Sequence, residues 1–588
     1  MDIKNWKRAD AEKVWNFIHM LRGQVNIRDN NQLVYVSYLL YLRKVHVFEQ
    51  EPTVAQLLDK HFMGEHPNLE FVLRDQVNEN IWSHISPMAK DVPLDVLETI
   101  ILDTNSNKLY TRNHNFTPAT LVDLVIRLLD IQAKDTVLDI CGGVGNFTVT
   151  SFFKQDKAQY YSREIDPQTM AVMDIRMDIL GQNGISRSIH AKMGNAFDLL
   201  CEEDTKTTVS FDKVFGDYPW DIDVDTPSVT TNRILAEIEN KIPGINKRHA
   251  SDWLFSFLLV HMMKETGKAV GIMMGNSTWT LTLSCNQARK YFLEQGLIEA
   301  VIALPPGLIP ITSLSASLIV FSHGNKAVRM IDATTLCTRK DRQITFTAKN
   351  MDDILNAYKT DTAYSCLVDV QTIMDKDDFM IHPSRYLAQK IPVPDGQPLG
   401  SVVLDMYRGV MLSSKQLDEL FTDQPSVYQY VMMKNINDGI IDEELPYISA
   451  LDKKYEKFLI PPRGLILSKT PPFKCAVVST TSQRKILANG NMFILKIDET
   501  KANPYYLQAL FESEYGMALL STICIGSVIN TFSKKMLEEL VIPIPPLEKQ
   551  NQIAKAYLAI QDEIKIYRKK LANASNRKLH IFDEVRGE

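Results

Sequence analysis

The central part of the sequence predicts an α/β fold with a doubly wound, mostly parallel sheet. Apolar, strand-like runs alternate with helical stretches between residues 117 and 322, as expected where helices cover both faces of such a sheet. A glycine-rich turn, Asp139-Ile-Cys-Gly-Gly-Val-Gly-Asn-Phe147, follows the apolar run 136–139. Gly143 and Gly145 let the backbone turn tightly and approach a ligand closely. The flanking regions predict an N-terminal helical domain and a C-terminal α+β domain that ends in a long helix.

Size and composition predict a multidomain globular protein. The chain has 588 residues, of which 45% are hydrophobic and 23% charged, and its net charge is −6. This length exceeds what one hydrophobic core supports. No apolar run reaches the roughly 20 residues of a membrane span, and the N-terminus lacks a signal-peptide core. The negative charge argues against a non-specific DNA coat but allows a specific binder with basic residues along one channel.

The cysteines give no sign of a metal site. All seven are scattered, without a C-x-x-C pair or a metal-ligand spacing. We therefore expect reduced cytosolic thiols and no metal.

A second motif, Asp217-Tyr-Pro-Trp220, follows the strand-like run 211–216. Together with the glycine turn it resembles motifs I and IV of the amino-methylating DNA methyltransferases, which use S-adenosylmethionine. Motif IV of that family has Asn, Asp or Ser, then two prolines and an aromatic residue. The resemblance implies that Asp217 and the Tyr218 carbonyl accept hydrogen bonds from the exocyclic amine of a flipped base. Pro219 keeps the second proline, and Trp220 is implied to stack on the base.

The chemistry of amino methylation explains this pair of acceptors. The N6 lone pair of adenine is delocalised into the ring, so two acceptors must draw its hydrogens out of plane before it attacks a methyl group. Tyr218 stands where the family has its first proline. Its carbonyl can still accept, but the loop loses the restraint that proline places on φ. The polar stretch from Trp220 to Ser251 predicts a long loop near the site.

Three further segments resemble the cofactor-binding motifs of the family. Phe116-Thr117-Pro118 precedes an amphipathic helix and resembles motif X, which lies against the methionine part of the cofactor. Alternatively, Thr117 is an N-cap with Pro118 at the first helical position. Glu164 ends a strand-like run about 20 residues beyond the glycine turn, where a Rossmann-like sheet presents an acid to a ribose. Asn195 stands where the family has an Asp beside the cofactor adenine. The implied S-adenosylmethionine site also includes Asp139, Gly143, Gly145 and Phe147.

The order of the motifs matches the gamma arrangement of adenine-N6 methyltransferases. Motif X precedes motifs I and IV, and a C-terminal reader follows, which implies a class I S-adenosylmethionine-dependent methyltransferase fold. Residues 15–23 resemble the helical N-terminal domain of type I restriction–modification methylation subunits, although a generic helical cap is also consistent. The weak signal over 325–390 predicts a closing extension. The expected domains are helical (1–105), catalytic (106–390), a linker (391–398), target recognition (399–546) and a C-terminal helix (547–588).

The region from residue 399 resembles a target-recognition domain of type I specificity subunits. The resemblance rests on segments 398–410, 431–439, 462–468, 526–533 and 541–550, in that order. Double-stranded DNA is the implied partner. Six basic side chains are candidates for phosphate or base contacts, the alternative being ordinary solvated residues: Lys434, Arg463, Lys469, Lys474, Arg484 and Lys485.

The last helix carries an apolar seam. Its members follow a 4-3-4-3-4 spacing typical of a coiled coil: Ile553, Tyr557, Ile560, Ile564, Tyr567 and Leu571. A helix packed on its own domain is the alternative. Because only one recognition domain is present, self-association through this helix would restore two, giving a homodimer with a two-part DNA site.

Together these patterns predict a DNA adenine-N6 methyltransferase that resembles a type I methylation subunit fused to half a specificity subunit, in the bacterial or archaeal cytoplasm at the nucleoid. A catalytically impaired DNA-binding module is the main alternative, because Tyr218 and Asn195 depart from the family pattern. Methylation of RNA or protein is a second alternative. The sequence has no G-x-x-x-x-G-K-[ST] motif, so cleavage would need a separate restriction or translocase subunit.

Overall fold

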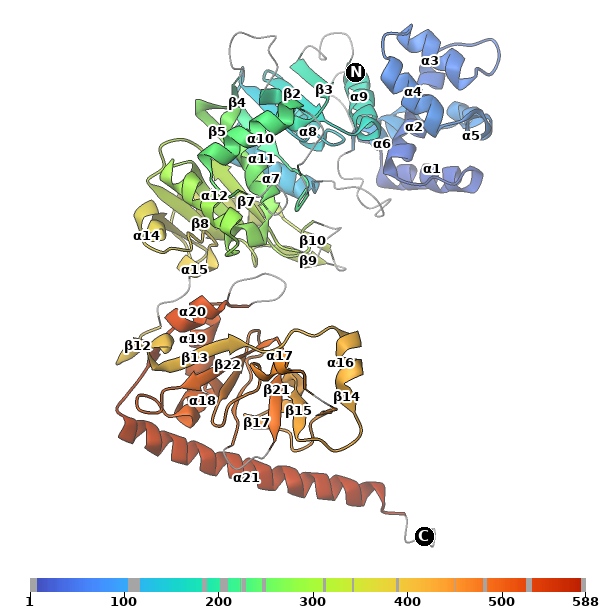
Figure 1. The fold of residues 1–588 in the computed structure, drawn as a ribbon. Helices are drawn as coiled ribbons and strands as arrows, with labels where there is room; N and C mark the ends of the chain where they lie inside the picture. Colours follow the sequence, from blue (N-terminus) through green and yellow to red (C-terminus); the bar gives the residue numbers. More distant parts are fainter. Residues whose placement is uncertain are drawn as a thin grey trace. The chain divides into compact units, whose positions relative to one another are not determined.

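The computed structural model divides the chain into two compact units, Met1–Leu387 and Ala388–Glu588 (Figure 1). Each unit is described by itself. The structure describes residues 8–103, 117–181, 188–200, 210–222, 224, 229–245, 250–309, 314–340, 343–387, 391–449, 451–479, 484–524 and 531–582.

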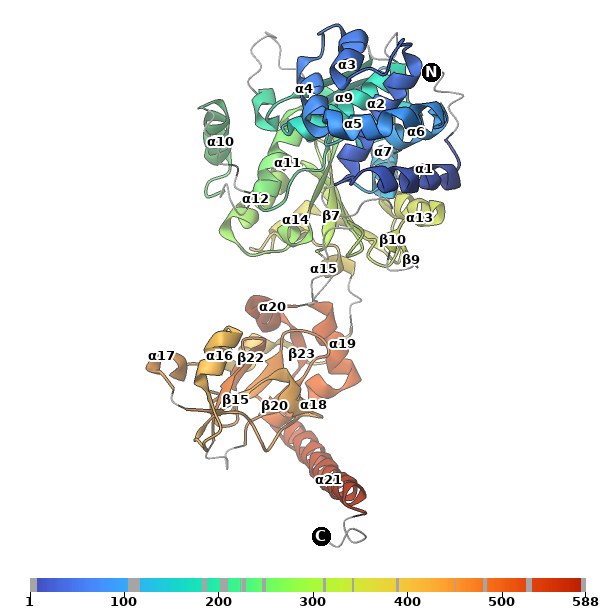
Figure 2. The same cartoon turned by 90° about the vertical axis from the view of Figure 1, so that its right-hand side faces the viewer.

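The first unit begins with a helical layer. Its helices are α1 (Ala11–Gln24), α2 (Asn30–Val45), α3 (Val54–Phe62), α4 (Pro67–Gln76), α5 (Glu79–Ile85), η2 (Ser86–Lys90) and α6 (Leu94–Leu102). Figure 2 shows this layer beside α9 (Pro167–Gly181), against which α2, α4 and α6 pack. Tyr38 Oη donates to Asp178 Oδ2 of α9 at 2.7 Å. The helical layer therefore packs onto α9, within the same unit.

A nine-stranded sheet forms the centre of this unit, in the order β11-β8-β6-β7-β5-β4-β1-β2-β3. Its strands are β1 (Thr136–Asp139), β2 (Gln159–Glu164), β3 (Ile189–Met193), β4 (Phe211–Gly216), β5 (Met263–Met274), β6 (Ile298–Ala303), β7 (Ala316–Phe321), β8 (Ala327–Asp332) and β11 (Ser365–Asp369). All neighbours are parallel except at β7 and at the edge pair β8–β11. This confirms the predicted α/β fold. The expected closing extension adds two strands to the sheet.

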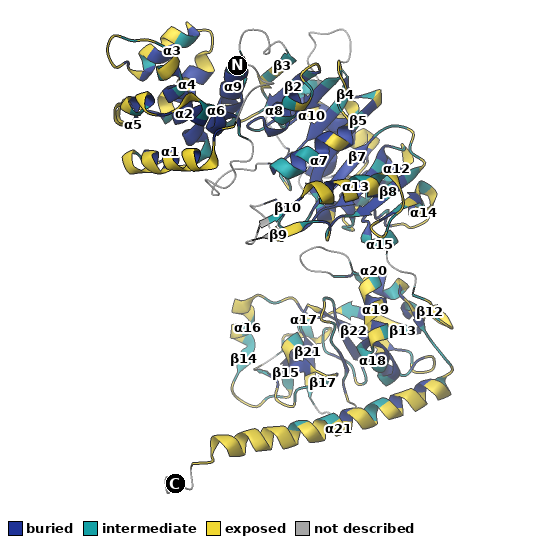
Figure 3. Cartoon of the chain, turned by 180° about the vertical axis from the view of Figure 1, so that it is seen from behind, coloured by how far each residue is buried: buried dark blue, intermediate teal, exposed yellow. Residues whose placement is uncertain are grey.

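Helices cover both faces of the sheet. Successive residues of β1 face different cores: Val137 joins the cluster of α7, α8, α9 and α13, and Leu138 joins the cluster of α10, α11 and α12 (Figure 3). This alternation is what a doubly wound sheet requires. The bounds are α7 (Ala119–Leu129), α8 (Asn146–Lys154), α10 (Val229–Lys241), α11 (Ser251–His261), α12 (Leu283–Glu294), α13 (Ala348–Lys359), α14 (Val370–Met374) and α15 (Ser384–Leu387). The prediction of a long loop after Trp220 is wrong in part, because this segment contains α10.

The second unit is α+β, with two four-stranded sheets in the orders β13-β22-β19-β20 and β14-β18-β15-β21. The strands of these sheets are β13 (Val403–Arg408), β14 (Phe421–Thr422), β15 (Tyr428–Val431), β18 (Tyr447–Ile448), β19 (Leu465–Ser468), β20 (Cys475–Val477), β21 (Lys485–Ala488) and β22 (Met492–Ile497). The remaining strands are β12 (Gly396–Pro398), β16 (Ile436–Asn437), β17 (Ile440–Ile441) and β23 (Val541–Pro543). Since β12 pairs with β23, the end of the expected linker belongs to this unit.

The helices of the second unit include the long C-terminal one. They are η7 (Leu399–Val402), α16 (Ser414–Leu420), α17 (Lys453–Glu456), α18 (Pro504–Glu512), α19 (Glu514–Thr522), α20 (Lys534–Glu539) and α21 (Leu547–Leu579). Helix α21 packs on α18, and Figure 3 shows that most of its length is exposed. None of the described helices is long and apolar enough to cross a membrane.

Candidate functional site

The glycine turn follows β1 and leads into α8. Gly143 has φ +55° and Gly145 has φ +84°, values that side chains disfavour. Gly145 N donates to Gly142 O at 2.8 Å and closes the turn. A Cβ on Gly142 would overlap the Ser162 hydroxyl, a close approach that the sequence did not reveal. The turn therefore brings bare backbone to the carboxyl edge of the sheet.

Three acidic side chains meet at this edge, where the neighbouring strands β4, β1 and β2 end. Asp139 ends β1, Glu164 ends β2 and Asp217 follows β4. Glu164 Oε2 accepts from the Gly143 N–H at 2.8 Å. Burial raises the pKa of Asp139 well above its usual value, and the charges of Asp217 and Glu164 raise it further. Such an acidic edge suits a cationic ligand.

Two other predicted cofactor residues, Asn195 and Phe147, make contacts within the protein. Asn195 Oδ1 accepts from Phe197 N at 3.0 Å and caps the short helix η5 (Ala196–Leu200). The ring of Phe147 is buried against Phe215, with ring centroids 4.3 Å apart, so this side chain belongs to the core. Phe116 lies outside the described residues. Among the described residues, no group of three or more His, Cys, Asp or Glu side chains could hold a metal ion.

Asp217 is held from the opposite side of the site by Thr117. The Thr117 hydroxyl donates to Asp217 Oδ2, and Thr117 is only 9% exposed. The N-cap alternative for Thr117 is wrong, because α7 begins after the buried Pro118 without a side-chain cap. Burial raises the pKa of Asp217 to about 6, while the Thr117 hydrogen bond lowers it. The Asp217 carboxylate is thus fixed in orientation, and its pKa lies close to neutral pH.

The rest of the Asp217–Trp220 motif alternates between surface and core. Pro219 is exposed, and Trp220 is half-buried. Trp220 Nε1 donates to Ile272 O of β5 at 3.2 Å, which orients the indole. Tyr218 is buried and its ring is stacked on Phe255 of α11. Its side chain therefore points into the protein.

Asp252 is a site-supporting residue that the sequence analysis missed. Asp252 is 3% exposed, and its Oδ2 accepts from Met274 N at 2.8 Å and from Ser277 Oγ at 2.9 Å. Burial raises its pKa to about 6, and the backbone N–H of Asp221 also bonds to it. Asp252 therefore links the residue after Trp220 to the end of β5. The sequence shows only an acid in the first turn of an apolar helix.

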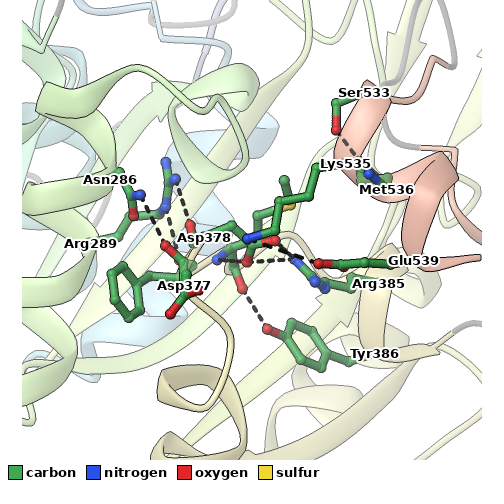
Figure 4. A network of polar contacts seen from close by, with 12 residues as sticks. Asn286, Arg289, Asp377, Asp378, Arg385, Tyr386, Ser533, Lys535, Met536 and Glu539 are labelled. Atoms are coloured by element: carbon green, nitrogen blue, oxygen red, sulfur yellow. Dashed lines mark hydrogen bonds and ion pairs between the residues drawn. The ribbon is translucent and has the colours of Figure 1, made fainter. Parts of the chain in front are cut away.

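Arg289 ties this region to the end of the first unit (Figure 4). It is fully buried, and its guanidinium donates to backbone carbonyls at 2.8–3.0 Å. These carbonyls belong to Ser277, Thr280, Asp378 and Phe379. Arg385 adds two 2.7 Å bonds to the Asp378 carboxylate. The segment that closes the unit is thereby fixed beside the residues that hold Asp252.

Three of the six candidate DNA-binding residues are occupied within the protein. Arg463 pairs with Glu499 at 2.8 Å. Lys474 Nζ donates to Met433 O at 3.0 Å, and Arg484 donates to Glu443 O at 2.9 Å. These contacts give the three side chains a structural role.

The other three candidates are better placed for a ligand. Lys434 is exposed. Lys485 lies 5.3 Å from the Tyr428 ring centroid and Lys469 lies 5.5 Å from the Phe493 ring centroid. These three side chains therefore stay candidates for phosphate contacts.

Replacing Lys434 or Lys485 by alanine is expected to weaken DNA binding uniformly across sequences. Each lost phosphate contact should reduce the slope of log K against log salt by about 1. Fluorescence anisotropy over a salt series measures this slope. Lys290→Ala is the control, because Lys290 pairs with Glu294 on α12. An unchanged slope in both variants would place the DNA contacts elsewhere.

The sheet, the glycine turn and the acidic edge define a class I S-adenosylmethionine-dependent methyltransferase fold. Residues 88–392, just over half of the chain, match the family model described as N-6 DNA Methylase. The chain belongs to this family. Residues 416–574 match the model of the Type I restriction modification DNA specificity domain. The predicted resemblance to a methylation subunit joined to a specificity domain is thereby confirmed.

Two curated relatives are type I methylase subunits, in agreement with the family match. The chain is 22% identical to the type I restriction enzyme HindI methylase subunit of Haemophilus influenzae, over 48% of this chain and 65% of the relative. The MjaIX methylase subunit of Methanocaldococcus jannaschii is 21% identical, over 48% and 53%. The chain thus covers between half and two thirds of these relatives. A type I methyltransferase subunit from Streptococcus thermophilus superposes with a TM-score of 0.48 and 17% identity, covering 63% of this chain and 97% of that one.

Proposed function

We propose that this protein transfers a methyl group from S-adenosylmethionine to N6 of an adenine flipped out of a specific DNA sequence. One observation carries the proposal. Asp217, oriented by Thr117, lies at the same sheet edge as the glycine turn, directly after β4, the strand next to β1. A fixed acceptor for an amine thus adjoins the expected cofactor site.

The cofactor fits the acidic edge because it carries a sulfonium and an amino group, and when bound it supplies an electrophilic methyl group. Glu164 would hold the ribose, and the turn with Asp139 would hold the methionine part. Asp217 and the Tyr218 carbonyl would accept the two N6 hydrogens, which turns the nitrogen lone pair towards the methyl group. Asp217 can then take the proton that N6 loses on methylation, since its pKa of about 6 suits a base near neutral pH. Trp220 would stack on the base.

We infer that residues 399–546 read the DNA sequence and that α21 pairs two copies of the chain. Tyr557 of the predicted seam faces its own unit, where it contacts Glu512. Ile553, Ile560 and Tyr567 are exposed at seven-residue spacing, as in a two-stranded coiled coil. Two copies would present two recognition domains to a two-part site. Restriction would need a separate subunit, and we expect the complex to act at the nucleoid in the cytoplasm.

Methylation-sensitive single-molecule sequencing tests the proposal. Genomic DNA would come from cells that express the wild type, Asp217→Ala or Asp352→Ala, the last changing an exposed aspartate of a surface ion pair with Arg127. We expect N6-methyladenine at one motif in the wild type and in the Asp352 variant, but none in the Asp217 variant. A motif in two separated halves would support the dimer. No modified adenine in any sample would favour a DNA-binding module without catalysis.

A further inference from the structure

The side chain of Tyr218 occupies a slot that two glycines leave open. The residue is 2% exposed, and its ring lies parallel to Phe255, at 5.0 Å and 7°. A Cβ on Gly216 would lie 3.1 Å from Tyr218 Cδ1, and a Cβ on Gly271 would lie 3.0 Å from the hydroxyl. Any side chain at these positions of β4 and β5 would crowd the ring. The two strands are thus shaped to admit Tyr218.

A hydrogen bond of defined direction holds the end of the ring. Tyr218 Oη lies 3.1 Å from Ser256 Oγ. The Ser256 hydroxyl donates to the Asp252 carbonyl at 2.8 Å, so its proton is already committed. The Tyr218 hydroxyl must therefore be the donor. Burial raises the pKa of Tyr218 well above its usual value, which keeps the hydroxyl protonated.

The neighbours of Tyr218 in the chain are fixed by separate contacts. Thr117 holds Asp217, and the Ile272 carbonyl holds the Trp220 indole. The backbone between Asp217 and Pro219 is restrained by the side chain of Tyr218. In the methyltransferase family that the sequence resembles, a proline stands at this position, and its ring restrains the backbone.

We propose that the Tyr218 side chain, anchored by Ser256 and Phe255, is a positioning residue for the catalytic loop. Its anchor fixes the Tyr218 carbonyl beside Asp217, which Thr117 holds, and it replaces the missing restraint of proline. The carbonyl contacts the substrate amine, whereas the phenol acts only through the backbone. This inference rests on the proposed function, because the anchored groups are the amine acceptors.

The direction of the hydrogen bond gives the proposal a distinctive signature. Tyr218→Phe keeps the ring and removes the hydroxyl donor. The Ser256 oxygen then loses one incoming hydrogen bond, and no buried donor is left without an acceptor. We therefore expect kcat to fall about fivefold. Ser256→Ala leaves a buried Tyr218 donor without an acceptor, so kcat should fall roughly thirtyfold. The double variant removes this donor as well and should return to the level of Tyr218→Phe. Single-turnover methyl transfer at saturating cofactor and DNA measures these rates.

Hydrogen exchange provides a second readout that needs no activity. The amide of residue 218 should exchange faster in Ser256→Ala than in Tyr218→Phe, and the double variant should resemble Tyr218→Phe. The matched control is Tyr160→Phe, because Tyr160 is also buried in the sheet and its hydroxyl donates to Ser151 O at 3.0 Å and Gln155 O at 2.7 Å. This control should leave kcat and the exchange of the residue 218 amide at wild-type values.

Two results would overturn the positioning role. One is wild-type kcat and loop exchange in both Tyr218→Phe and Ser256→Ala. The other is an equal loss of both quantities in Tyr160→Phe, which would reduce the anchor to general stability. If the wild type itself transfers no methyl group, the proposed function fails, while the exchange pattern still decides whether Tyr218 orders the loop.

Discussion

Replacing Asp217 by alanine is expected to lower the single-turnover rate of methyl transfer by about 100- to 1,000-fold, the range seen when one preorganised polar contact to a reacting group is removed. The change deletes an acceptor for the amine and takes the partner from the buried Thr117 hydroxyl. Asparagine keeps one carbonyl acceptor but cannot take the proton that N6 loses, so Asp217→Asn should lose about 100-fold, at the lower end of this range. Asp352→Ala is the charge-matched control.

Titration of the Asp217 carboxylate should make the reaction rate fall at acidic pH, which appears as an acidic limb of the pH–rate profile. The pKa of Asp217 is raised to about 6, chiefly by burial. The ionised form accepts the amine hydrogens, and this form is lost as the pH falls through the pKa. We therefore expect kcat/KM to decline below about pH 6, approaching tenfold per pH unit. Single-turnover rates measured between about pH 5 and 8 would reveal the limb.

Asp217→Asn also identifies the group that titrates. Asp252 has its pKa raised to about 6 as well, and its protonation would loosen the loop from the other side. If Asp217 controls the limb, the rate of Asp217→Asn should become flat in this range. A limb that persists in Asp217→Asn would contradict this assignment and transfer it to Asp252 or to another group.

Much of the fold could be predicted because its signals are local. The runs that form β1 and β4 are strand-like, and each leads directly into its motif. Helix α10 was missed because its apolar residues are diluted by polar ones, and the helix is stabilised by burial of Ile234, Leu235 and Ile238 in the core. The antiparallel entry of β7 between β5 and β6 depends on contacts that no local period encodes.

The site residues also fall into two groups: those that local signals predict, and those that depend on contacts between distant segments. Asp217, Glu164 and the glycines follow strands at readable spacings, so the sequence could locate them. The partners that orient them come from distant segments: Thr117 lies 100 positions from Asp217, and Ser256 lies 38 positions from Tyr218. Basic side chains were the weakest prediction. Charge alone cannot separate a side chain that binds phosphate from Arg484, which donates to the Glu443 carbonyl within the protein.

Arg176 offers the largest expected effect on stability. It is 3% exposed, and it joins the helical layer to the glycine turn through Ile101 O at 2.8 Å, Val144 O at 2.7 Å and Asn146 Oδ1 at 2.9 Å. Burial lowers its pKa to about 10, so it remains charged at neutral pH. Arg176→Ala should lower the free energy of unfolding by about 3 kcal/mol, since three buried acceptors lose their donor. Urea unfolding measures this loss.

The position of Arg176 implies a loss of cofactor affinity as well as of stability. Val144 and Asn146 belong to the glycine turn, the proposed cofactor site. Loosening this turn by about 1.4 kcal/mol would raise the Kd for S-adenosylmethionine tenfold, as calorimetric titration can measure. Lysine should not rescue either quantity, because one ammonium cannot reproduce the planar set of donors. Arg289→Ala is the matched control: it removes an equally buried guanidinium that bonds four carbonyls on the other side of the sheet, so stability should fall while the Kd stays at the wild-type value. Equal Kd changes in both variants would mean that cofactor affinity follows global stability, and that Arg176 has no particular hold on the turn.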